Sequence, residues 1–81
     1  MKDPLVVNVS HDEREGIWHV LSSDVPGLHA EAESLDALIE IISDVAPDLI
    51  SANIPDWGTR YPAGFSLLVQ HKVSINRAHA A

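Results

Sequence analysis

The sequence predicts a small α+β domain, a βββαβ unit in which an antiparallel sheet has one face covered by a kinked helix. Two observations predict this class. Apolar and polar residues alternate in segments before residue 34 and after residue 64, as in strands, and between them apolar residues recur at three- and four-residue steps, as in a helix. At 81 residues the chain suffices for one modest core. We therefore expect a single domain over residues 1–81.

The first two strands form a predicted hairpin. Residues 5–11 alternate with the two-residue period of a half-buried strand. The polar run 12–16 ends in Gly16, which tolerates a positive φ and predicts an antiparallel return. Trp18 and Val20 are expected to face the core together. Residues 24–27, Asp-Val-Pro-Gly, then have the composition of a tight turn or a bulge.

A third strand is expected from Leu28, with apolar residues on one side and His29, Glu31 and Glu33 on the other. Ser34 then precedes a change of period and is a suitable N-cap for a helix. The helix is expected to end near Asn53, with a kink or two abutting helices at Pro47. Its apolar stripe consists of Leu35, Leu38, Ile39, Ile42, Val45, Ala46, Leu49 and Ile50.

The last third of the sequence predicts a loop and a long strand. Two prolines and a glycine make residues 54–62 a loop, and its Trp57 and Tyr61 predict that it folds back over an edge of the core. Both tryptophans of the chain, Trp18 and Trp57, are expected in the core or at its edge. Alternation predicts a final strand over residues 65–75, and residues 76–81 are expected to form a frayed tail.

One helix covers one face of four strands, so the other face is expected to be open. The residues expected there are Val6, Ile17, Leu21 and Leu68 together with His19, His29, Glu31, Glu33, Gln70 and Lys72. A mixed face of this kind suits a partner or self-association. The alternative is that these apolar residues are the scattered ones that any protein surface carries.

Charge and composition narrow the class of function. A net charge of −7 with only five basic residues argues against direct binding of nucleic acid and favours a basic protein partner. The absence of cysteine excludes disulfides and thiolate chemistry and fits the cytoplasm. No secretion signal is present, and no apolar run approaches the roughly 20 residues that cross a bilayer, so we expect no membrane association.

No catalytic, cofactor or metal site is predicted. The five histidines, His11, His19, His29, His71 and His79, include no pair at helical i, i+4 spacing. Strand pairing decides whether His19 and His29 approach each other. The sequence also contains no Gly-rich phosphate loop, no Gly-x-Ser-x-Gly turn and no paired nucleophile and base. We therefore expect no enzymatic activity.

Three segments carry a resemblance to a known family. They are Gly16-Ile17-Trp18 at the end of the hairpin, Ser-Ser-Asp-Val-Pro-Gly-Leu at residues 22–28, and Ala-Glu-Ser-Leu-Asp-Ala-Leu at residues 32–38. In this order and spacing they resemble the HicB-like antitoxin family, particularly its short relatives of unknown function, over residues 6–51. The resemblance implies a partial ribonuclease-H-like βββαβ fold without catalytic function in a prokaryote.

The resemblance also implies a partner. Antitoxins of this family cover the active surface of HicA, a small basic mRNA-cleaving toxin, and often repress their operon through a C-terminal DNA-binding segment. Here only residues 76–81 follow the last predicted strand, so we expect no separate DNA-binding domain. The alternative is a homo-oligomeric module, a dimer or larger, without a toxin. The expected partner-binding residues are acidic: Asp12, Glu13, Glu15, Asp24, Glu31 and Glu33.

Overall fold

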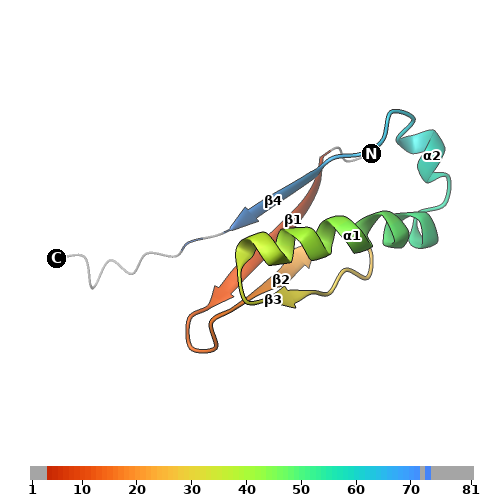
Figure 1. Cartoon of the computed structure of the whole chain (residues 1–81). Coiled ribbons are helices and arrows are strands. Elements are labelled where there is room, and N and C mark those ends of the chain that lie inside the picture. The colour runs from red at the N-terminus through yellow and green to blue at the C-terminus, as the bar shows by residue number, and fades with distance from the viewer. Residues whose placement is uncertain (1–3, 72, 74–81) are drawn as a thin grey trace.

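The computed structural model describes residues 4–71 and residue 73, and it has the predicted βββαβ order (Figure 1). One long helix packs on a four-stranded sheet, and a second helix of one turn precedes the last strand. The elements are β1 (Leu5–Asp12), β2 (Ile17–Ser23), β3 (Glu31–Ala32), α1 (Leu35–Asn53), α2 (Trp57–Arg60) and β4 (Leu67–His71). The α+β class is therefore confirmed. The short helix α2 was not expected.

The sheet is mixed, with the strand order β3-β2-β1-β4. β1 and β2 pair antiparallel, as do β2 and β3. β4 pairs parallel to β1, with Leu5 opposite Leu67. The prediction of a wholly antiparallel sheet is therefore wrong at β4. A parallel neighbour requires a crossover connection, and α1 with the loop after it supplies one.

The core lies between α1 and the face of the sheet that alternation predicts. In β1, Leu5, Val7 and Val9 are buried, and Val25 and Leu28 join them from the turn after β2. α1 contributes most of its predicted stripe, of which Leu38, Ile42, Ala46 and Ile50 are buried, but Ile39 is 38% exposed, so its predicted place in the stripe is wrong. The Oγ of Ser34 accepts a hydrogen bond from the Ala37 amide (3.1 Å), which confirms the N-cap. α1 is a single helix through Pro47, so the alternative of two abutting helices is wrong.

β3 is shorter than predicted, and β2 contains a bulge. Only Glu31 and Ala32 are strand, although the Val20 amide still donates to the Ala30 carbonyl (3.1 Å). Residues 28–30, which were expected to be strand, are not, and Val25 and Leu28, between β2 and β3, are buried in the core. The β1–β2 register shifts between Asn8 and Val9, so that Leu21 has no opposite residue and is 62% exposed.

Aromatic side chains close both ends of the core. Trp18 lies half-buried at the hairpin end, stacked on His11 (centroids 4.6 Å apart) and edge-on to His71 (4.7 Å). At the other end Tyr61 is buried against Phe65, so the loop does fold back over the core. Trp57 is 41% exposed, so the expectation of a core position is wrong for this residue.

β4 begins two residues later than predicted, at Leu67. Residue 72 and residues 74–81 lie outside the described part of the chain, and with them the predicted end of the strand at Ile75, the tail and Lys72. Within the described part of the chain, no helix combines the length and apolar character needed to cross a bilayer.

Candidate functional site

The face of the sheet opposite α1 is crossed by a polar ladder. Gln70 Nε2 donates a hydrogen bond to Asn8 Oδ1 (2.8 Å), and Asn8 Nδ2 donates to Ser22 Oγ (2.9 Å). These bonds join β4, β1 and β2. Gln70 was expected on this face, whereas Asn8 was not singled out. The signal for it was present in the sequence, because Asn8 alternates with the buried Val7 and Val9.

The apolar residues of this open face occupy separate rows. Val6 lies opposite Leu68 in β4, at the end of the sheet where β1 begins. Ile17 lies opposite Asp12 at the hairpin end, on the other side of the polar ladder. Leu21 sits alone at the bulge. The open face therefore has a polar centre, with Val6 and Leu68 side by side at one end and Ile17 at the other.

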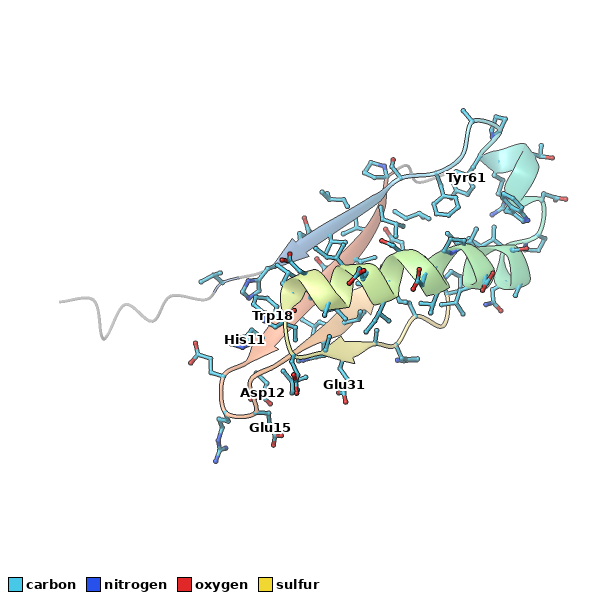
Figure 2. All side chains as sticks on the ribbon, viewed as in Figure 1. His11, Asp12, Glu15, Trp18, Glu31 and Tyr61 are labelled. Atoms are coloured by element: carbon cyan, nitrogen blue, oxygen red, sulfur yellow. The ribbon has the colours of Figure 1, made fainter. Side chains whose placement is uncertain are left out.

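Three predicted acidic residues come together at the hairpin end of the open face. Asp12, Glu15 and Glu31 line a shallow hollow of about 260 Å³ together with Ile17 and His19. We call these three carboxylates the acidic corner, and Figure 2 shows them at one end of the molecule. Asp12 also shapes the hairpin, because its Oδ1 accepts hydrogen bonds from the amides of Arg14 (3.0 Å) and Glu15 (3.3 Å).

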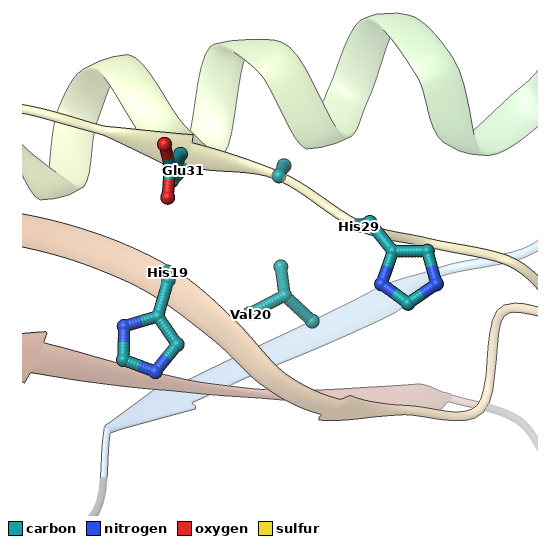
Figure 3. Close-up of a pocket in the computed structure, with 5 residues that line it drawn as sticks. His19, Val20, His29 and Glu31 are labelled. Atoms are coloured by element: carbon teal, nitrogen blue, oxygen red, sulfur yellow. The ribbon is translucent and has the colours of Figure 1, made fainter.

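A second, larger hollow adjoins the acidic corner. It has a volume of about 420 Å³ and lies between β2 and the segment that leads into β3, where the regular ladder is interrupted. Its lining residues are His19, Val20, His29, Ala30 and Glu31, and Figure 3 shows the two imidazoles on either side of Val20. His19 and Glu31, which are opposite each other in the β2–β3 pair, belong to both hollows.

His19 and His29 share one hollow with a single carboxylate, that of Glu31. His19 faces Glu31 across the strand pair, and His29 lies two residues before Glu31 in the chain, so both reach the same hollow. Among the residues that the structure describes, no group of three or more His, Asp or Glu side chains is arranged to hold a metal ion.

The other three predicted residues lie outside both hollows. Glu13 is exposed in the hairpin turn, and Glu33 is exposed between β3 and α1. Asp24 lies at the opposite end of β2, where its Oδ2 accepts a hydrogen bond from the Val6 amide (2.8 Å) and its own amide donates to the Val6 carbonyl (2.8 Å). Asp24 therefore holds the start of β1 against the turn after β2.

Replacing Asp24 by alanine is expected to lower the free energy of unfolding by about 1–3 kcal/mol, because the half-buried Val6 amide loses a charged acceptor. Urea unfolding followed by circular dichroism measures this change. Asp24→Asn is the matched control, since it keeps an acceptor oxygen of the same reach and should recover most of the loss. An unfolding midpoint in Asp24→Ala equal to that of the wild type would contradict the structural role.

The surface charge around the site is strongly negative. Of the basic residues only Arg14 and Arg60 lie in the described part of the chain, whereas of the acidic residues only Asp3 lies outside it. Arg60 is in α2, far from the hairpin in the fold (Figure 1). Arg14 lies in the hairpin turn beside the acidic corner, but the acidic residues around it leave an excess of negative charge that attracts cationic groups.

Within the described residues, the α+β domain has one sheet face covered by α1 and an open face that carries shallow hollows. The chain is a member of the family described as domain of unknown function DUF1902, whose sequence pattern matches residues 4–72. No match was found among curated proteins.

A solved structure has a similar fold. It is the crystal structure of the hypothetical protein TTHA1013 from the extremely thermophilic bacterium Thermus thermophilus, with a TM-score of 0.59. The two sequences are 23% identical, and the match covers 88% of this chain and 94% of that one. At this identity the likeness shows the fold alone.

Proposed function

We propose that this protein is a non-catalytic binding protein of the HicB antitoxin type, which acts in the cytoplasm by covering the active surface of a small basic mRNA-cleaving toxin. The observation that carries the proposal is the acidic corner. It gathers Asp12, Glu15 and Glu31 on an open sheet face, in a chain with a net charge of −7. Complementary potentials accelerate the encounter with a basic partner and select it over others.

The shape of the site supports binding of a protein surface. Two adjoining hollows of about 260 and 420 Å³ share His19 and Glu31, and both are open to solvent. Open hollows of this kind suit the insertion of single side chains, such as arginine, from a partner's surface. Small substrates usually bind in deeper clefts that bury most of their surface.

The resemblance to HicB supports the same proposal from the sequence. Its three segments form the start of β2, the turn that carries Asp24, and the approach to α1 with its Ser34 cap. In the sequence these segments directly adjoin His19, His29 and Glu31, which line the hollows. The partial ribonuclease-H-like fold that the resemblance implies has the βββαβ order found here.

A pull-down of tagged protein from its native cell extract tests the proposal. The expected result is recovery of a small basic protein whose ribonuclease activity this chain silences. Recovery should fall when the wash is raised from roughly 50 to 300 mM salt, because screening weakens an attraction between exposed charges. Recovery of this chain alone, with no basic protein at low salt, would contradict the antitoxin proposal and favour the homo-oligomeric alternative.

A further inference from the structure

The two edges of the sheet differ in how they are protected. β3 is only two residues long, and Glu31 and Glu33 place charges on and beside it. β4 runs for five residues, Leu-Leu-Val-Gln-His, without Pro, Asp, Glu, Lys or Arg, and it pairs with β1 in unbroken register. Short, charged edges prevent pairing with another chain, whereas long, uncharged edges invite it.

The backbone groups that β4 presents to solvent can be identified. The Leu5 amide donates to the Ser66 carbonyl (2.9 Å), so the backbone groups of Ser66 face β1. The N–H and C=O groups of successive strand residues point in alternating directions. The backbone N–H and C=O groups of Leu68 and Gln70 therefore also point toward β1. The amides and carbonyls of Leu67, Val69 and His71 therefore point outward from the edge.

Side chains on the same edge are incompletely covered. Val69 lies beside Val7 and Leu67 beside Leu5 in the β1–β4 register. Val7 and Leu5 are buried, yet Val69 and Leu67 are only half-buried, although all four face the helix side of the sheet. The edge thus leaves apolar surface that a neighbouring strand would cover.

Charge indicates which molecule pairs with this edge. Residues 61–71 contain no Asp, Glu, Lys or Arg, so β4 is an uncharged border of an otherwise acidic chain. A basic partner is attracted toward the acidic corner, which lies at the hairpin end, on β1, the hairpin turn and β3, and includes no residue of β4. Two copies, each with a net charge of −7, approach with the least repulsion where neither carries charge.

We propose that two copies of this chain pair antiparallel through β4, about a two-fold axis at Val69, and join their sheets into one. In this register Val69 pairs with its own counterpart, and Leu67 pairs with His71 of the second copy. Every outward amide and carbonyl of β4 then gains a hydrogen-bond partner in the second copy. The two-fold symmetry closes the assembly at two copies, because each β4 edge is used once. The acidic corners lie at the hairpin ends of the two sheets and take no part in the pairing of the two β4 strands.

The variant Val69→Pro tests this pairing, with oligomeric state measured by analytical ultracentrifugation. The Val69 amide points outward, so proline removes a donor between the two copies while the hydrogen bonds to β1 remain. We expect a wild-type dimer and, in the variant, a dissociation constant at least about 10-fold higher, because each of the two copies loses a hydrogen bond. Circular dichroism checks that the variant folds.

Two lysine substitutions complete the test. Leu68→Lys keeps every backbone hydrogen bond but adds a charge to the edge of both copies, and it should also weaken the dimer. Leu21→Lys is the matched control, because Leu21 is similarly exposed on the open face (62% against 45%) but lies in β2. It should leave the dimer intact. If Val69→Pro fails to fold, the oligomeric states of the wild type, Leu68→Lys and Leu21→Lys still test the β4 pairing.

A monomeric wild type at high micromolar concentration would overturn the inference. So would a dimer that survives Leu68→Lys or one that is lost in Leu21→Lys, since either result places the interface elsewhere. The dimer should not weaken between roughly 50 and 300 mM salt, unlike a complex with a basic partner. The inference is independent of the proposed function, because a monomer that silences a toxin would overturn only the dimer.

Discussion

Leu38→Ala is expected to lower the free energy of unfolding by about 3 kcal/mol or more. Leu38 is 0% exposed and belongs to the core cluster that α1 forms with β1, so truncation removes buried methyl groups and leaves a cavity. Small domains are stable by only about 5–15 kcal/mol, and the loss therefore takes a large share of the total. Urea unfolding at equilibrium measures it.

Ile39→Ala is the matched control for Leu38. Ile39 is the next residue of α1 but is 38% exposed, so the same kind of truncation should cost about 1 kcal/mol or less. Equal losses at the two positions would mean that α1 does not pack on the sheet through the stripe that contains Leu38, Ile42, Ala46 and Ile50.

Reversing two charges of the acidic corner should produce the largest effect on partner binding. The double variant Glu15→Lys and Glu31→Lys is expected to weaken affinity for the proposed basic partner about 100-fold or more, because attraction becomes repulsion at two positions of the acidic corner. Asp12 is left unchanged since it shapes the hairpin. Both substituted side chains are exposed, so the unfolding midpoint should stay close to that of the wild type.

The helix supplies the control for this charge reversal. Glu40→Lys with Asp44→Lys makes the same change in net charge on exposed positions of α1, on the opposite side of the sheet from the acidic corner. This control should lower affinity much less than the corner variant. Equal losses would show that net charge alone governs binding and that the acidic corner is not the site. Isothermal titration calorimetry with the purified partner distinguishes the two results.

The direction of β4 illustrates what strand patterns do and do not determine. Alternation predicts which side chains face the core, and it placed Leu67 and Val69 correctly on the helix side. The same alternation occurs in parallel and antiparallel strands, so it does not predict the direction of β4. The direction follows from the order of elements. β3 runs parallel to β1, α1 crosses back, and the next strand must run like β3. Two antiparallel connections followed by one helical crossover therefore predict that β4 runs parallel to β1, which makes the sheet mixed.

The site was predicted in part because its residues depend on register. Glu31 was recognisable as an outward-facing acid from the alternation of its predicted strand, and Asp12 from its place in the polar run 12–16. Their closeness depends on the pairing of β2 with both β1 and β3. The role of Asp24 depends on the bulge at Leu21, which shifts the end of β2 so that a carboxylate meets the Val6 amide. Such shifts leave no periodic signal in the sequence.

The polar ladder also constrains the order in which the fold is completed. Its members Asn8 and Gln70 are 62 residues apart, and β1, which comes first in the sequence among the four described strands, is an inner strand whose parallel neighbour β4 comes last among them. The β1–β2 hairpin can form from local contacts, but β4 must close a long loop before it joins. Until residues 67–71 have emerged from the ribosome, the edge of β1 that pairs with β4 is therefore exposed, although β1 is the strand with the most buried side chains.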